Sequence, residues 1–195
     1  MKTVWPYRIN GLNKMIANAE LITGWMSREE LEFLAEAARN ANFILEFGCY
    51  QGRSTRALAD NTNGIVYAVD PWGMPYYNDD GSQAGFIDTK NALKSFIENL
   101  KDHIDVGRVV PIHDYSWNFV SPIKFDFIFI DGDHRYEKVK DDIHLALRLI
   151  RAGGIIAGHD YTHPDWPGVK KAVDETFRGQ DLQYNGSIWS IEVQR

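Results

Sequence analysis

The feature that most constrains the fold is the short run Phe125–Ile130, which reads FDFIFI. Five of its six residues are apolar, whereas a strand with one solvent-exposed face would alternate apolar and polar side chains. A run this short and this apolar is typical of a parallel strand that is buried on both faces. The sequence therefore predicts a parallel sheet with this segment near its centre.

Strand-like and helix-like segments alternate around this run. The other predicted strands are Phe43–Phe47, 65–69, 108–112 and 155–158. Helices are predicted over 27–40, 136–150 and 169–177, and two more begin at Ser54 and about Asp88. The first of these helices opens with a capping box, Ser27 and Glu30, and Gly153-Gly154 is expected to end the one over 136–150.

The last two predicted strands, 182–185 and 188–193, are joined by a tight turn at Gly186 and must be antiparallel. We therefore predict an α/β fold, a Rossmann-like doubly wound sheet that is mostly parallel. It has one antiparallel strand near the C-terminus and helices on both faces.

Composition indicates a globular protein of the cytoplasm. Of 195 residues, 44% are hydrophobic and 25% charged, the usual balance for a folded domain. We expect a single domain over 1–195, with a helical cap over 1–40 and an α/β core over 41–195. No apolar run reaches the roughly 20 residues of a membrane helix. The net charge of −6 disfavours nucleic acid as a partner, and the single cysteine, Cys49, suits a reducing compartment.

The loop after the first strand indicates the kind of ligand. It reads EFGCYQG from Glu46 to Gly52, with a carboxylate where the strand ends and two glycines before a helix. A dinucleotide-binding loop has three glycines in the pattern G-x-G-x-x-G, and a carboxylate at its head would repel a pyrophosphate. The loop therefore favours a ligand that carries an ammonium or sulfonium group.

Polar residues also follow the second and third strands. Asp70 lies roughly 20 residues beyond the glycine loop, where an acid accepts hydrogen bonds from ribose hydroxyls, although it could also simply start a turn. Trp72 is placed to border a purine. Asp114 is the first choice for meeting the amine of an adenine, ahead of Ser116 and Tyr115, although Asp and Ser are ordinary turn residues as well.

The loops after the fourth and fifth strands read DGDHRY from 131 and GHDY from 158. Consecutive crossovers usually make such strands neighbours, and clustered carboxylates are costly unless a cation or proton bridges them. We therefore predict a divalent metal held by Asp131, His159 and Asp160, with His134 as a further ligand or a general base. The alternative is that Asp131 caps the next helix and that His159 is an ordinary loop residue.

Together these motifs resemble the class I S-adenosylmethionine-dependent methyltransferases, from about Ser27 onward. The segments GWMSREELEFLAEAA, LEFGCYQGRST, VYAVDPW, FIFIDGDHRYEKVKDDI and GGIIAGHDYTHPDWPGVKKAV are similar to a bacterial group of small methyltransferases in that class. The resemblance implies methyl transfer to an oxygen of a small molecule or sugar. It also implies that Glu46, Gly48 and Gly52 hold the methionine end of the cofactor and that Asp70 holds its ribose.

The motifs and the resemblance give the full candidate site. The candidate cofactor-binding residues are Glu46, Gly48, Tyr50, Gly52, Ser54, Thr55, Asp70, Trp72, Asp114 and Asp131. The candidate catalytic residues are His134, Asp131 and His159, and the candidate metal ligands are Asp131, His159 and Asp160. Metal-dependent O-methyltransferases of the catechol type carry Asp-Asn where this chain has His159-Asp160. Imidazole suits zinc, manganese or iron better than magnesium, so the metal stays open.

Two other classes of function remain compatible with the sequence. A nicotinamide-dependent oxidoreductase uses a similar sheet, but Glu46 and the missing third glycine disfavour it. A non-catalytic S-adenosylmethionine-binding protein would have no use for the crowded acids around Asp131. The segment GMPYYNDDGSQAG, 73–85, predicts a lid over the active site, where a small-molecule acceptor would bind; the alternative is a plain surface loop. The aromatic residue Trp5 and a helix bearing Trp25 are expected to cover the cofactor or to form a homo-oligomer contact.

Overall fold

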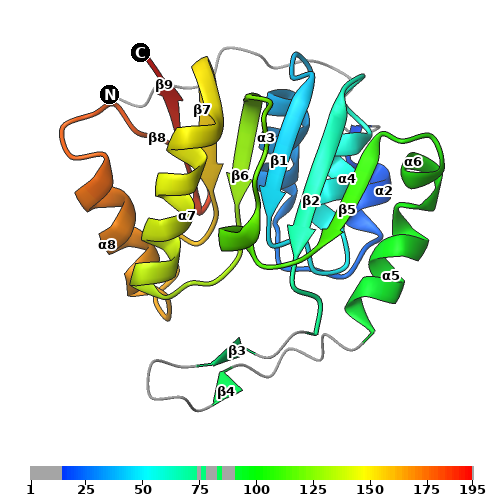
Figure 1. Cartoon of the computed structure of the whole chain (residues 1–195), viewed down its shortest axis with the longest axis horizontal. Helices are drawn as coiled ribbons and strands as arrows, with labels where there is room; N and C mark the ends of the chain where they lie inside the picture. Colours follow the sequence, from blue (N-terminus) through cyan, green and yellow to red (C-terminus); the bar gives the residue numbers. More distant parts are fainter. Residues whose placement is uncertain (1–14, 74–75, 78–82, 85–90, 195) are drawn as a thin grey trace.

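The computed structural model describes residues 15–73, 76–77, 83–84 and 91–194. Its main element is a seven-stranded sheet in the order β5-β2-β1-β6-β7-β9-β8 (Figure 1). The strands are β5 (Val109–His113), β2 (Ile65–Asp70), β1 (Phe43–Phe47), β6 (Phe125–Ile130), β7 (Ile150–Gly158), β9 (Ile188–Val193) and β8 (Gln183–Asn185). Neighbours pair in parallel from β5 to β7, and β9 is antiparallel to both β7 and β8. The predicted fold class, with one reversed strand, is confirmed.

Helices cover both faces of this sheet (Figure 1). Helices α2 (Ala17–Glu20), α3 (Arg28–Ala38), α4 (Arg53–Ala59) and α5 (Ala92–Asn99) contribute to one apolar core, and α7 (Tyr136–Leu149) and α8 (Pro167–Thr176) to the other. In β6, Phe127 and Phe129 lie in the first core, whereas Ile128 and Ile130 lie in the second. The run FDFIFI is apolar on both faces because each face of this strand is covered by helices.

Two element boundaries differ from the sequence prediction. Helix α7 ends at Leu149 and β7 begins at once at Ile150, so the expectation that Gly153-Gly154 ends the helix is wrong. Ile150 is fully buried and pairs with Phe125, and the register then shifts before Phe127. The strand therefore enters the sheet early because a buried isoleucine pairs there, and the glycines lie within the irregular part of the strand.

The segment before α3 is attached to the core through Arg53 of α4. The Arg53 guanidinium donates hydrogen bonds to four carbonyls of the segment 19–26, at 2.7 to 3.4 Å. The sequence predicted a helix that bears Trp25, but Trp25 lies outside any helix. Carbonyl groups of this segment accept hydrogen bonds from Arg53. The exposed ring of Trp25 lies 5.0 Å from that of Tyr50, in the glycine loop.

The predicted lid falls largely outside the described residues, as does Trp5. Within it, β3 (Tyr76–Tyr77) and β4 (Gln83–Ala84) form a short antiparallel ribbon. Figure 1 shows this ribbon beyond the carboxyl end of β2. The remaining elements are helix α6 (Lys101–Asp105) and the 3-10 turn η1 (Ser116–Asn118). Among the residues described, no helix has the length and apolar character to cross a membrane.

Candidate functional site

Each of the loops that follow β1, β6 and β7 begins with an amide that donates a hydrogen bond to the end of the neighbouring strand. The Gly48 amide donates to the Val69 carbonyl at 3.0 Å, the Asp131 amide to Phe47 at 2.7 Å, and the His159 amide to Ile130 at 3.0 Å. Because these strands are parallel, their carboxyl ends meet at one edge of the sheet. This is the edge at which ligands bind in open α/β sheets.

Glu46 lies near the end of β1 and is fully buried. Its Oε2 accepts a hydrogen bond from Thr55 Oγ1 at 2.5 Å, and Oε1 has no partner among the described residues. Burial raises the pKa of Glu46 to about 7, although hydrogen bonds from Ser54 and Thr55 oppose the shift. A buried carboxyl with an unpaired oxygen is costly unless a donor or a cation reaches it. The residue is therefore suited to receive a positively charged group.

The two glycines allow the loop to pass close to its neighbours. Gly48 has φ +83°, and a Cβ there would lie 2.0 Å from the carbonyl oxygen of Asp131. Gly52 has φ +91°, and its Cβ would lie 2.3 Å from Leu100 Cδ2. Only glycine combines this backbone conformation with this separation. The loop after β1 is consequently packed directly on the loop after β6.

Asp70 shapes the same loop from the end of β2. Its Oδ2 accepts hydrogen bonds from the amides of Cys49 at 2.7 Å and Tyr50 at 2.9 Å, and its Oδ1 from that of Trp72 at 2.7 Å. A carboxylate has about four acceptor positions, so these bonds leave room for one more donor. Asp70 thus starts a turn, which was the alternative role that the sequence allowed. Its hydrogen bond to a ribose stays a prediction. Trp72 is buried against Phe96, and its Nε1 donates to the Tyr50 carbonyl.

The residues after β5 form contacts within their own turn and one distant contact that the sequence did not predict. Asp114 accepts hydrogen bonds from the Tyr115 amide and the Asn118 side chain, which close the turn into η1. Ser116 Oγ donates to Asp142 Oδ1 at 2.5 Å. Asp142 is buried on α7, and burial raises its pKa to about 7. The predicted contact of Asp114 with an adenine amine stays a prediction.

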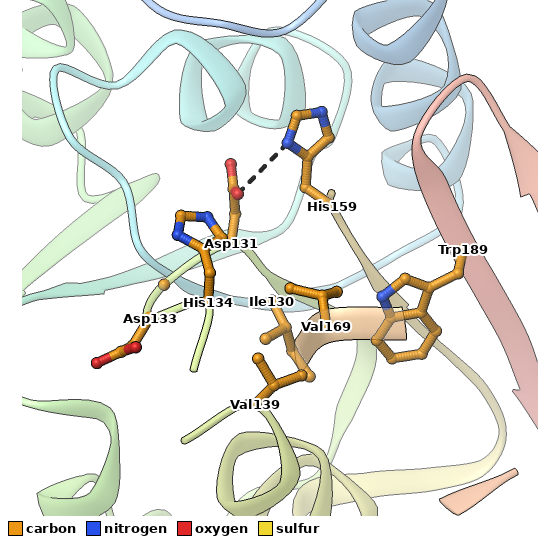
Figure 2. Close-up of a pocket in the computed structure, with 9 residues that line it drawn as sticks. Ile130, Asp131, Asp133, His134, Val139, His159, Val169 and Trp189 are labelled. Carbon is orange, nitrogen blue, oxygen red and sulfur yellow. Dashed lines mark ion pairs between the residues drawn. The ribbon is translucent and has the colours of Figure 1, made fainter. Parts of the chain in front are cut away.

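Two carboxylates and two imidazoles gather where β6 and β7 end, and Figure 2 shows three of them, Asp131, His134 and His159. His159 Nδ1 lies 3.5 Å from Asp131 Oδ1 and 3.3 Å from Asp160 Oδ1, and His134 Nε2 lies 2.8 Å from Asp160 Oδ2. One ligand atom each from Asp131, His134 and Asp160 lies within 4.8 Å of the others, a spacing that suits a metal ion. The four side chains, Asp131, His134, His159 and Asp160, are called the acidic centre below.

His159 is the more enclosed of the two imidazoles. Its side chain is 8% exposed, whereas that of His134 is 28% exposed. Burial alone would lower the pKa of His159, but its contacts with Asp131, Asp160 and Glu30 raise it to about 12. The three carboxylates that face the ring therefore favour the protonated form of His159. Both imidazoles named in the sequence prediction lie near these carboxylates, and the ligand set that includes His159 stays a prediction.

The reading of Asp131 as a helix cap is not supported. Helix α7 begins after Arg135, and no side chain caps its N-terminus. The neighbouring Asp133 instead accepts hydrogen bonds from the amide and guanidinium of Arg135. Asp131 is therefore left to face the imidazole of His159 (Figure 2).

A small pocket lies beside the acidic centre. Its apolar side is lined by Ile130, Val139, Val169 and Trp189 (Figure 2). The ring of Trp166 stacks on His134, with centroids 4.6 Å apart. The polar side of the pocket is lined by Asp131, Asp133, His134 and His159.

Comparison with known proteins identifies the class to which this fold and site belong. Residues 45–161 match a family described as a methyltransferase domain. The chain therefore belongs to this methyltransferase family, and its fold is that of the class I S-adenosylmethionine-dependent methyltransferases.

Individual proteins are similar to this chain in sequence or in fold. An uncharacterized protein of Acanthamoeba polyphaga mimivirus, R132, is 30% identical over 155 residues, which cover 74% of this chain and 65% of that protein. The chain thus spans about two thirds of the length of this curated relative. The O-methyltransferase TomG from Streptomyces achromogenes, in complex with SAM, has a TM-score of 0.64 at 15% identity over 99% of this chain and 93% of its own. The O-methyltransferase from Bacillus cereus, in complex with SAH, has a TM-score of 0.62 at 19% identity, with coverages of 97% and 94%.

Proposed function

We propose that this protein transfers the methyl group of S-adenosylmethionine to a hydroxyl oxygen of a small molecule or sugar, with a divalent cation bound at the acidic centre. The observation that carries the cofactor is the buried, unpaired Oε1 of Glu46 beside the close approach of Gly48 to Asp131. An ammonium or sulfonium group would satisfy that oxygen, whereas a phosphate would be repelled by it.

The acidic centre fits a divalent cation by its donor set. Carboxylate oxygens of Asp131 and Asp160 face the same point as the imidazoles, and mixed carboxylate and imidazole sets suit manganese, zinc or iron. A cation held there would act as a Lewis acid toward the acceptor hydroxyl. His134 is the candidate general base, since it is the more exposed imidazole and borders the apolar pocket. Alignment of the acceptor oxygen with the methyl group would supply much of the remaining rate enhancement.

The proposal is tested by calorimetric titration of the purified protein with S-adenosylhomocysteine and, separately, with NADH. Micromolar or tighter binding of S-adenosylhomocysteine without binding of NADH is the expected result. Preference for NADH would support the oxidoreductase alternative. Binding of S-adenosylhomocysteine without turnover on any hydroxyl acceptor would support the non-catalytic alternative, which the acidic centre disfavours.

Cofactor affinity should depend on pH through Glu46. Because its pKa in the free protein is about 7, the carboxyl must lose its proton to pair with the ammonium group of S-adenosylhomocysteine. Affinity should therefore rise between pH 6 and pH 8, by up to about tenfold per pH unit below the pKa. Titrations at these pH values should show the rise in the wild type and a flat, weaker profile in Glu46→Gln. A flat wild-type profile would contradict this role.

The same shift has the opposite effect on the stability of the cofactor-free protein. The folded pKa of about 7 lies above the ordinary glutamate pKa of 4.5, so the folded state holds this proton more tightly. The free energy of unfolding should fall as pH rises from 4.5 through 7, by ~3 kcal/mol from this group. The difference between wild type and Glu46→Gln in urea unfolding at pH 5 and pH 8 isolates this contribution from that of Asp142.

A further inference from the structure

Glu30 of helix α3 lies beside the acidic centre, against His159. The sequence marks it only as part of a capping box, and its Oε2 does accept the Ser27 amide at 2.8 Å. Its Oε1 points the other way, toward the β8–β9 turn and β7. There it accepts the amide and hydroxyl of Ser187, both at 2.9 Å, and lies 3.3 Å from His159 Nε2.

The carboxylate is held firmly in this position. Glu30 is 5% exposed, and a Cβ on Gly186 would lie 2.8 Å from its Oε1, so the turn between β8 and β9 packs directly on it. Its two oxygens accept hydrogen bonds from the Ser27 amide and from the amide and hydroxyl of Ser187. Glu30 is therefore a carboxylate fixed by helix α3 and by the C-terminal hairpin together.

His159 lies between this carboxylate and the acidic centre. Its Nε2 faces Glu30 Oε1, and its Nδ1 faces Asp131 and Asp160. Nε2 is completely buried and makes no hydrogen bond to the described residues, and Glu30 Oε1, at 3.3 Å, is the carboxylate oxygen that faces it. The two ring nitrogens thus serve two separate sets of carboxylates.

We propose that Glu30 is a positioning residue for metal binding, which accepts the Nε2 proton of His159 and so directs the Nδ1 lone pair toward the cation site between Asp131 and Asp160. The inference rests on the proposed function, because it assumes a divalent cation there. The position of Glu30 distinguishes the two imidazoles. The Nε2 atom of His159 faces a carboxylate outside the acidic centre, as the second nitrogen of metal-ligating histidines almost always does. The Nε2 atom of His134 instead contacts Asp160, which belongs to the centre. His159 is then a ligand and His134 stays available to the acceptor.

The test compares variants of the two capping-box residues. Glu30→Gln removes the carboxylate behind His159, whereas its amide oxygen can still accept the Ser27 amide. Ser27→Ala removes the hydroxyl that accepts the Glu30 amide and leaves the carboxylate in place. Mn²⁺ alone is titrated into each protein by calorimetry after chelator treatment, and S-adenosylhomocysteine is titrated in parallel.

The expected result is a 10- to 100-fold loss of Mn²⁺ affinity in Glu30→Gln, with Ser27→Ala within about twofold of the wild type and S-adenosylhomocysteine affinity unchanged in both. If Glu30→Gln fails to fold, Glu30→Asp keeps the charge, withdraws the carboxylate by one methylene, and should show the same loss. Wild-type Mn²⁺ affinity in the Glu30 variant, or an equal loss in Ser27→Ala, would overturn the proposal. So would a wild type that binds no Mn²⁺, whereas the methyltransferase assignment would stand or fall on the S-adenosylhomocysteine titration.

Discussion

Replacement of His134 by alanine is expected to lower kcat for methyl transfer by about 10²- to 10⁴-fold, the range that a positioned general base contributes. The imidazole is the more exposed of the two in the acidic centre and borders the pocket. With it removed, no other imidazole of the described residues is both exposed and in contact with Asp160. Turnover is measured as S-adenosylhomocysteine release with a hydroxyl acceptor, chosen from a small-molecule and sugar panel, that the wild type methylates.

The control for His134→Ala is His163→Ala. The His163 ring also lies near Trp166, with centroids 6.0 Å apart, but it has no contact with the carboxylates of the acidic centre. His163→Ala should retain activity within a few-fold, and both variants should bind Mn²⁺ and S-adenosylhomocysteine as the wild type does. A parallel loss of Mn²⁺ affinity in His134→Ala would identify His134 as a ligand and contradict its role as the base.

The fold could be predicted because its signals are local. The run Phe125–Ile130 needs apolar residues on both faces, and the structure places successive residues in different cores. The turn at Gly186 required the final strands to be antiparallel, and they are. The helix boundary before Ile150 could not be predicted in this way, because the pairing of Ile150 with Phe125 is a contact between distant residues.

The candidate site could be predicted where its residues lie in short motifs at strand ends. The motifs after β6 and β7 carry the acidic centre, and the two loops come together because the two strands are neighbours. The contacts of Glu30 and Asp142 could not be predicted, for a different reason. Each residue has a sufficient local explanation in the sequence, as a capping residue and as one of several charges on a helix. Their partners, His159 and Ser116, are distant in the chain.

Replacement of Gly48 by alanine should have the largest effect on the fold. The new Cβ would lie 2.0 Å from the Asp131 carbonyl oxygen and 2.7 Å from Gly132 Cα. These are backbone atoms that cannot rotate away, so the loops after β1 and β6 would have to separate. We expect a loss of about 4 kcal/mol or more in the free energy of unfolding, measured in urea, and loss of S-adenosylhomocysteine binding if the variant folds.

Gly107→Ala separates the two costs that Gly48→Ala combines. Gly107 has φ +72°, close to the +83° of Gly48, but a Cβ there would meet no atom within 4 Å. Its substitution should therefore show only the cost of the left-handed backbone, about 1–2 kcal/mol. The excess in Gly48→Ala then measures the close approach of the two loops. Equal losses in the two variants would mean that the backbone conformation alone requires glycine at position 48. The loops after β1 and β6 could then move apart without cost to stability.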